Sequence, residues 1–142
     1  MDLGCGTGML SIGLAVLGAP HVVGVDLDAD ALSQAAANVS QFEGLPVDLL
    51  RADVAELPSH VAMRAVASLV LMNPPFGSWR KGADAAFLRA AFHVSRRTVY
   101  SLHKRSTRAH IRKVALQQLH ASAAEVIAEL EYDLPATYKH HK

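Results

Sequence analysis

The chain has 142 residues, a single cysteine and a formal net charge of +1, and 51% of its residues are hydrophobic. This length predicts one domain, and this apolar share excludes a disordered chain. No apolar run is long enough to span a bilayer, and the start of the chain lacks a secretory pattern. One cysteine cannot form an internal disulfide, which suits a reducing compartment. We therefore expect an intracellular protein of the nucleus or cytoplasm that does not act at a membrane.

Charge is distributed unevenly along the chain. Residues 1–72 carry two basic and eight acidic side chains, whereas residues 73–142 carry twelve basic and five acidic ones. Between Gly77 and Lys113, ten Lys or Arg residues accompany one acid, Asp84. Such a stretch can be a solvated surface, but its one-sided charge favours a polyanionic partner.

Strand and helix patterns alternate from one end of the chain to the other. Strands are expected at residues 1–3, 21–26, 47–52, 66–72, 98–102 and 125–130. Helices are expected to open at Thr7, Asp28, Asp84 and Thr107, with the two aspartates as side-chain caps. This alternation predicts an α/β fold with a mostly parallel sheet and helices on both faces.

A glycine-rich loop follows the first expected strand and reads Asp2-Leu3-Gly4-Cys5-Gly6-Thr7-Gly8. Glycines let the backbone turn sharply and approach a ligand without Cβ clashes. The next helix begins at this loop, as in the loops that bind dinucleotides. The G-x-G-x-G spacing with an acid two residues upstream makes Asp2, Gly4, Gly6 and Gly8 candidate cofactor-binding residues.

Two acids stand at the ends of the next two expected strands. Asp26 ends the second strand and Asp53 follows the third. A carboxylate at the first of these places can accept hydrogen bonds from both hydroxyls of a ribose. Each acid alone can be a turn residue, but acids at successive strand ends favour a cofactor site. We therefore predict that Asp26, Leu27, Asp53 and Val54 bind the cofactor.

The segment Asn73-Pro74-Pro75-Phe76 directly follows the fourth expected strand. It can be a proline-rich turn. However, the side-chain oxygen of Asn73 and the main-chain carbonyl of Pro74 can both accept hydrogen bonds from one amino group, and prolines hold these oxygens rigid. Phe76 offers a flat face on which a base can stack. These four residues are the candidate catalytic residues.

Together the segments resemble motifs I and IV of the Rossmann-like class I methyltransferases, the second with the pattern (D/N/S)-P-P-(Y/F/W). The resemblance implies S-adenosylmethionine as cofactor. It places Asp2 near the ammonium group of the cofactor and lets Asp53 accept a hydrogen bond from its adenine amino group. Hydrogen bonds from an acceptor amine to Asn73 and Pro74 would free the nitrogen lone pair for attack on the sulfonium methyl group.

The chain resembles more narrowly the methyltransferase-like protein 5 family, which methylates N6 of one adenosine in small-subunit ribosomal RNA. The most specific segments are Val99-Tyr100-Ser101-Leu102-His103-Lys104 and Tyr132-Asp133-Leu134-Pro135. The resemblance implies ribosomal RNA as substrate and a small zinc-binding activator subunit, which would form a heterodimer along the edge strand 47–51. It also implies residues before the first strand and a last strand beyond residue 139. Residues 1–142 are therefore predicted to be an incomplete methyltransferase domain.

The basic stretch supplies candidate ligands for RNA phosphates, which position a protein without specifying sequence. Those expected on loops beside the acceptor site are Arg80, Lys81, Lys104, Arg105 and Arg108. Other cations are expected on helix faces, where a solvated role is at least as good an interpretation: Arg89, Arg96, Arg112 and Lys113. No metal site is predicted, because neither Cys nor acidic ligands accompany His103, His140 and His141 at useful spacing.

Two other functions fit parts of this pattern. Protein glutamine methyltransferases use a similar motif, usually with Tyr where this chain has Phe76. A truncated, inactive domain that only binds RNA or a partner would also retain the family's segments. Phe76 and the basic stretch favour an RNA adenine-N6 methyltransferase that acts on a flipped base.

Overall fold

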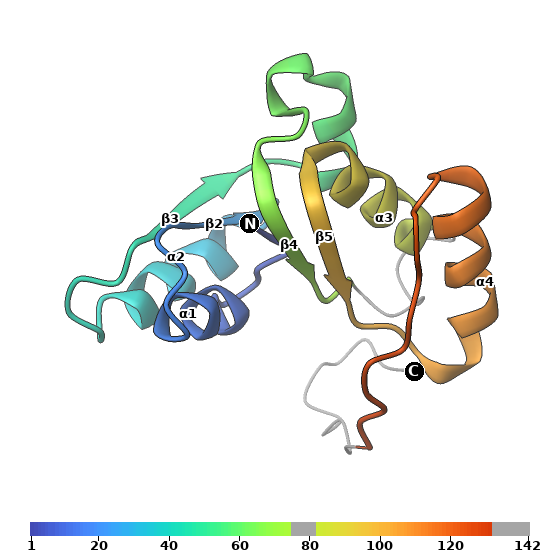
Figure 1. Ribbon diagram of the computed structural model, residues 1–142. Coiled ribbons are helices and arrows are strands. Elements are labelled where there is room, and N and C mark those ends of the chain that lie inside the picture. Colours follow the sequence, from blue (N-terminus) through green and yellow to red (C-terminus); the bar gives the residue numbers. More distant parts are fainter. Residues whose placement is uncertain (75–81, 132–142) are drawn as a thin grey trace.

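A computed structural model describes residues 1–74 and 82–131 (Figure 1). Five parallel strands form one sheet in the order β3-β2-β1-β4-β5. The strands are β1 (Asp2–Leu3), β2 (Val22–Asp26), β3 (Val47–Arg51), β4 (Ala67–Met72) and β5 (Ser95–Ser101). The helices are α1 (Met9–Val16), α2 (Ala29–Val39), α3 (Ala83–Val94) and α4 (Arg108–Lys113), and α4 continues as a wider turn over Val114–Gln118.

The two side chains of β1 point to opposite faces of the sheet and show which helix covers each face. Successive strand residues point to opposite faces. Asp2 is buried against Ser11 of α1, whereas Leu3 joins the main hydrophobic core together with Leu88 of α3. Helices α1 and α3 therefore cover opposite faces of the sheet. The larger core lies on the α3 side and includes Val70 of β4 and buried residues of the last helix.

Most of the elements predicted from the sequence are confirmed. The first five strands and the helices occur in the expected order, and β3 lies at one end of the sheet. Asp28 caps α2, because its carboxylate accepts from the backbone N–H groups of Asp30 and Ala31. Within the described ranges, no helix is both long and apolar enough to cross a bilayer.

Three local predictions are wrong. Asp84 does not cap α3, because the helix begins one residue earlier, after Gly82, and places Asp84 in its first turn. Arg96 lies in β5 rather than on a helix face. The predicted strand at 125–130 is extended chain without a strand partner among the described residues. A strand needs a neighbour for its backbone groups, and this segment instead runs beside α4 (Figure 1), where Glu129 pairs with Arg105 and Arg108.

Gly8 fixes the packing of the loop before α1. Its φ is +84°, a conformation that L side chains rarely adopt, and a Cβ atom there would lie 3.1 Å from the Cβ of Ala35 in α2. Ala35 is fully buried and has little room to move. Gly18, just after α1, has a φ of +93°, but a Cβ atom there would meet nothing within 4 Å.

We expect Gly8→Ala to lower the free energy of unfolding more than Gly18→Ala does. Each substitution places a Cβ atom in the left-handed region, at a cost of about 1–2 kcal/mol, and only Gly8→Ala adds a steric conflict with Ala35. Urea denaturation of both variants beside the parent measures the difference. Equal losses would show that the loop can move away from α2 without cost.

Candidate active site

A cleft of about 640 Å³ opens at the carboxyl ends of the strands, where β1 lies between β2 and β4. The chain proceeds outward from β1 to one side through β2 and β3, then crosses to the other side for β4 and β5. In open α/β sheets, ligands bind at such a switch point. The cleft is lined by Gly4, Asp26, Leu27, Asp28, Asp53, Val54, Asn73 and Phe87.

The glycine loop bends tightly over the end of β2. The backbone N–H groups of Gly4 and Cys5 both donate to the carbonyl of Val25, at 2.8 and 3.0 Å. Gly4 has a φ of +72°, and a Cβ atom there would lie 2.9 Å from the ring of Phe87. The positive φ and the nearby ring of Phe87 together favour glycine at this position.

The carboxylate of Asp26 joins the glycine loop to the start of α2. One oxygen accepts from the N–H of Gly6 at 2.8 Å, and the other accepts from the N–H of Asp28 at 3.0 Å. A carboxylate has about four lone-pair sites, so two remain for a ligand. Asp26 is half-buried at the cleft wall and can hold the loop and accept from hydroxyl groups at once.

Asp53 and Val54 form the wall of the cleft beyond β3. Asp53 caps the following helical turn, since its side chain accepts from the N–H of Ala55 at 2.8 Å. Val54 is only 3% exposed and belongs to the main core. A half-buried carboxylate beside an apolar side chain can accept a hydrogen bond from the edge of a flat ring while the apolar side chain contacts its face.

Asp2 is completely buried and does not line the cleft. Its Oδ2 accepts from the hydroxyl of Ser11 at 2.7 Å, and its Oδ1 has no partner among the described residues. Burial raises the pKa of Asp2 above its ordinary value, and the bond from Ser11 opposes this shift only in part. Gly6 and Gly8 are also not among the residues that line the cleft.

The acceptor segment begins at the end of β4. Asn73 is exposed and lines the cleft, whereas Pro74 is buried beside it. The sequence predictions for Pro75, Phe76, Arg80 and Lys81 fall outside the described residues. The structure therefore brings Asn73 into one cleft with Asp26 and Asp53, from the ends of three different strands.

Two lining residues were not predicted from the sequence. Asp28 was identified only as a helix cap, and no role in the cleft was predicted for Phe87. Phe87 is half-buried and spaced like a core residue, so periodicity alone does not distinguish it from one. Its contact with Gly4 depends on how α3 crosses the sheet, which the sequence pattern does not specify.

Two further groups near the cleft are neutral by burial. Burial raises the pKa of the Cys5 thiol to about 12, so this cysteine is not a nucleophile. Burial also lowers the pKa of His103, although the nearby Asp84 opposes the shift. His103 lies next to the acceptor segment, because the N–H of Leu102 donates to the carbonyl of Met72.

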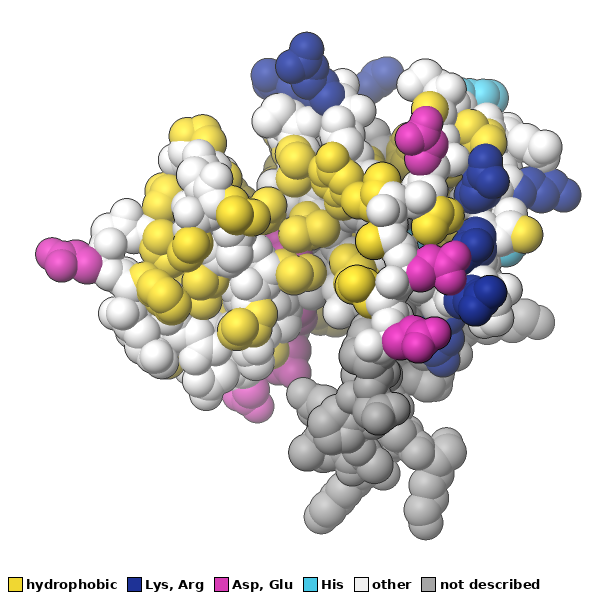
Figure 2. Space-filling model, turned by 60° about the horizontal axis from the view of Figure 1, so that its bottom comes forward, with side chains coloured by type: hydrophobic (Ala, Val, Ile, Leu, Met, Phe, Trp, Pro, Cys, Tyr) yellow, Lys and Arg dark blue, Asp and Glu magenta, His cyan; other side chains and the backbone are white. Residues whose placement is uncertain are grey.

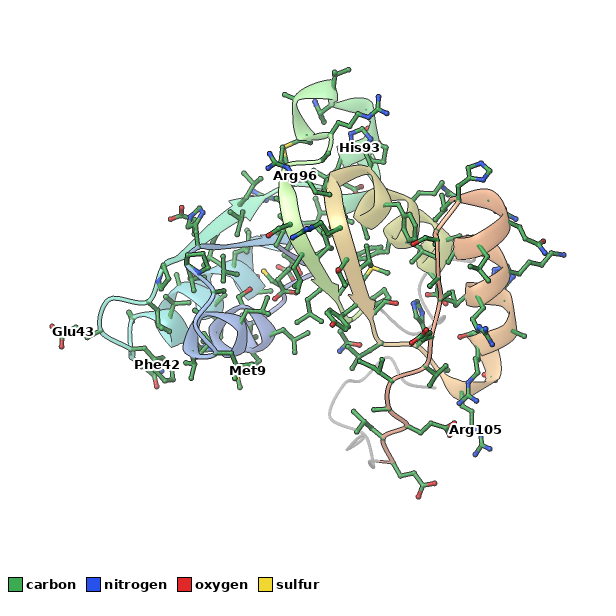
Figure 3. The ribbon with its side chains drawn as sticks, viewed as in Figure 1. Met9, Phe42, Glu43, His93, Arg96 and Arg105 are labelled. Carbon is green, nitrogen blue, oxygen red and sulfur yellow. The ribbon has the colours of Figure 1, made fainter. Side chains whose placement is uncertain are left out.

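The remaining predicted RNA ligands follow β5. Lys104 and Arg105 are exposed, and Arg108 begins α4. Arg105 and Arg108 both pair with Glu129 of the segment after α4. Figure 3 shows Arg105 pointing outward at the carboxyl end of the sheet.

The parallel sheet, the glycine loop and the cleft with Asp26 and Asn73 define a Rossmann-like class I methyltransferase. Residues 1–98 match the family model described as a methyltransferase domain. Sequence comparison identifies the chain more narrowly: it belongs to the family of rRNA N(6)-adenosine-methyltransferases METTL5. The predicted fold class and family membership are thereby confirmed.

The relatives come from distant organisms. The chain is 49% identical over 142 residues to the METTL5 protein of Danio rerio, covering 99% of this chain and 67% of that protein. It is 37% identical to metl-5 of Caenorhabditis elegans, covering 100% and 68%. A crystal structure of a Pyrococcus horikoshii protein superposes with a TM-score of 0.68 at 38% identity, covering 82% and 55%. The chain thus spans about two thirds of the length of the curated relatives it matches.

The buried carboxyl of Asp2 predicts a specific dependence of stability on pH. The pKa of Asp2 is raised in the folded chain, so the unfolded chain loses this proton first as the pH rises. Folding must then take up a proton or bury a charged carboxylate, which lowers the free energy of unfolding. We expect Asp2→Asn to gain thermal stability relative to the parent as the pH rises from about 4, the ordinary pKa of Asp, toward neutrality.

Melting curves recorded at a series of pH values test this expectation. Glu43→Gln is the control, because Glu43 lies in an exposed turn and points away from the molecule (Figure 3). A difference between Asp2→Asn and the parent that stays constant with pH would contradict the raised pKa.

Proposed function

We propose that this chain transfers a methyl group from S-adenosylmethionine to the N6 amine of an adenosine in ribosomal RNA. The observation that carries the proposal is the cleft in which Asp26, Asp53 and Asn73 meet. The names of the relatives support the reaction and the substrate, because the proteins of Danio rerio and Caenorhabditis elegans are rRNA N(6)-adenosine-methyltransferases.

The cleft fits the cofactor in size and in chemistry. Its volume of about 640 Å³ lies within the range of small-molecule sites. In our assignment Asp26 accepts from the ribose hydroxyls, and Asp53 accepts from the adenine amino group. Leu27 and Val54 supply apolar contacts to the ring, and Gly4 lets the backbone approach the methionine portion. Asp2 acts from beneath the loop, as a buried group near the ammonium.

The bound cofactor supplies an electrophilic methyl group on a sulfonium. Asn73 and Pro74 prepare the nucleophile, since the side-chain oxygen of Asn73 and the carbonyl of Pro74 accept hydrogen bonds from the adenine NH2. This draws the nitrogen toward tetrahedral geometry and frees its lone pair. Pro75 and Phe76 remain predictions from the sequence: Pro75 stiffens the segment, and Phe76 stacks on the base. The product cation loses its proton readily, so no strong base is needed.

Ribosomal RNA is the acceptor we favour over a protein glutamine side chain. Phe76 and the basic residues that follow β5 suit a flat base and a phosphate backbone. The proposed RNA ligands are Arg80, Lys81, Lys104, Arg105 and Arg108. The inactive, purely binding alternative is disfavoured by the cleft, in which the carboxylates and Asn73 are retained. A substrate of this kind places the protein in the nucleus or the cytoplasm.

We propose that a small zinc-binding activator subunit pairs with β3. This strand ends the sheet, and an exposed edge offers backbone groups to an added strand. An apolar groove of about 360 Å³ lies beside it, lined in part by Leu50, Leu57 and Met63. Leu50 is 41% exposed, so a partner there would cover apolar surface.

Titration of S-adenosylmethionine into the purified chain, followed by calorimetry, tests the cofactor site. We expect binding by the parent and at least a tenfold loss of affinity in Asp26→Ala, because two acceptor positions of the carboxylate disappear. Asp26→Asn retains one oxygen and should lose less. Asp30→Asn is the matched control, since Asp30 is exposed in the first turn of α2 and outside the cleft. Equal binding by Asp26→Ala and the parent would refute the assignment of Asp26.

Substitution of Asn73 separates acceptor activation from cofactor binding. We expect Asn73→Ala to bind S-adenosylmethionine within about twofold of the parent. It should transfer methyl groups about 10²–10³-fold more slowly, which is the usual effect of removing one hydrogen-bonding group that stabilises the transition state. The measurement is N6-methyladenosine formed in small-subunit ribosomal RNA, quantified by mass spectrometry after digestion, with the activator present. Undiminished transfer by Asn73→Ala would exclude the proposed role.

A further inference from the structure

A second group of cations lies at the amino ends of β4 and β5, opposite the cleft. It consists of Arg64, Arg96 and Arg97, which are all exposed, and we refer to it as the amino-edge patch. β4 has six residues at about 3.3 Å each, so this patch lies about 20 Å from Asn73. Figure 3 shows Arg96 and His93 at this end of the molecule and Arg105 at the other.

Hydrogen bonds tie the segments of the patch into one unit. The N–H of Ala65 donates to the carbonyl of His93 at 2.8 Å, and the Nε of Arg96 donates to the carbonyl of Ala65. The ring of His93 is in turn hydrogen-bonded to the carbonyl of His60, at 3.2 Å. Arg64 is therefore held beside Arg96 even though 32 residues separate them in the sequence.

The backbone takes two unusual shapes at this place. Ala65 has a φ of +51°, which is uncommon for a residue other than glycine. In β5, Ser95 pairs with Ala67 and Thr98 pairs with Leu69, so β5 holds one extra residue opposite β4. This bulge contains Arg96 and Arg97. Bulges redirect side chains and often occur next to functional sites.

The arginines of the patch have no acidic partner. No carboxylate of the described residues forms an ion pair with Arg64, Arg96 or Arg97, whereas Arg105 and Arg108 share Glu129. In Figure 2 the dark blue side chains at the upper margin stand apart from the magenta ones, but those on the right alternate with them. Exposed guanidinium groups without a carboxylate partner are complementary to phosphates.

We propose that the amino-edge patch is a second binding site for the phosphate backbone of the substrate RNA, separate from the loops around the cleft. The inference rests on the proposed function, since it takes a folded RNA as the partner. A folded RNA can reach both ends of the sheet at once, whereas a short strand in the cleft cannot. The patch therefore contributes affinity for structured RNA and none for the acceptor nucleotide alone.

The test compares two double variants of equal charge. Arg64→Gln/Arg97→Gln removes two patch cations and spares the bond from Arg96 to Ala65. Arg89→Gln/Arg112→Gln removes two exposed cations from α3 and α4 and is the matched control. Binding of a small-subunit ribosomal RNA fragment is followed by fluorescence anisotropy over a series of salt concentrations, and binding of a short adenosine-containing oligonucleotide is followed in parallel.

We expect the patch variant to bind the folded fragment more weakly, with a slope of log K against log salt concentration reduced by about two, or one per lost phosphate contact. Its binding of the oligonucleotide and of S-adenosylmethionine should equal that of the parent. If Arg64→Gln/Arg97→Gln is not folded by circular dichroism, Arg97→Gln alone should reduce the slope by about one.

Several results would overturn the proposal. An equal change of slope in both double variants would mean that only overall charge matters. Unchanged RNA binding together with self-association of the patch variant would mean that these arginines protect the edge of the sheet from pairing. A parent chain that binds no RNA fragment would refute both this site and the proposed substrate, while normal RNA binding by the patch variant would refute this site alone.

Discussion

The carboxylate of Asp26 is the junction on which the cleft depends. It binds the glycine loop through the N–H of Gly6 and the entry to α2 through the N–H of Asp28, so three consecutive segments are fixed at one point. Backbone N–H groups at such places would otherwise need water or a ligand as partner. The chain's own hydrogen bonds thus define the shape of the loop, and a loop ordered in this way lowers the entropic cost of binding a ligand.

The sequence predicted the parts of the structure that depend on local rules. Glycine spacing, capping by Asp28 and the apolar runs each have a short-range cause, and all three appear as expected. The segment 125–130 alternated like a strand, but alternation states only which side chains would share a face and not whether a neighbouring strand is present. Likewise, Gly82 in a left-handed conformation precedes α3 in place of Asp84, which lies in the first turn of the helix.

Site residues could be predicted from the sequence where polar residues follow strands. They could not be predicted where tertiary packing determines which side chains reach the cleft. Asp26, Asp53 and Asn73 follow three parallel strands, whose ends must share one edge of the sheet. Phe87 reaches the same cleft only through the crossing of α3. For Asp2 the motif predicted more than the structure shows. Its position in the motif suggested contact with a ligand, whereas its side chain is fully buried and bonded to Ser11 of α1.

The distribution of charge follows from this layout. The first half of the chain supplies most of the acids, and three of them, Asp26, Asp28 and Asp53, line the cleft at the carboxyl ends of β2 and β3, where acceptors for hydroxyl and amino groups are expected. Such a negative wall would repel RNA if it stood alone. The second half supplies most of the cations, and those that the structure describes lie in α3, in β5 and in the segments after β5, on the other side of the switch point. The order β3-β2-β1-β4-β5 thus separates the carboxylate-bearing side, which we propose binds the cofactor, from the cationic side, which we propose binds RNA, and Asn73 follows β4 between the two.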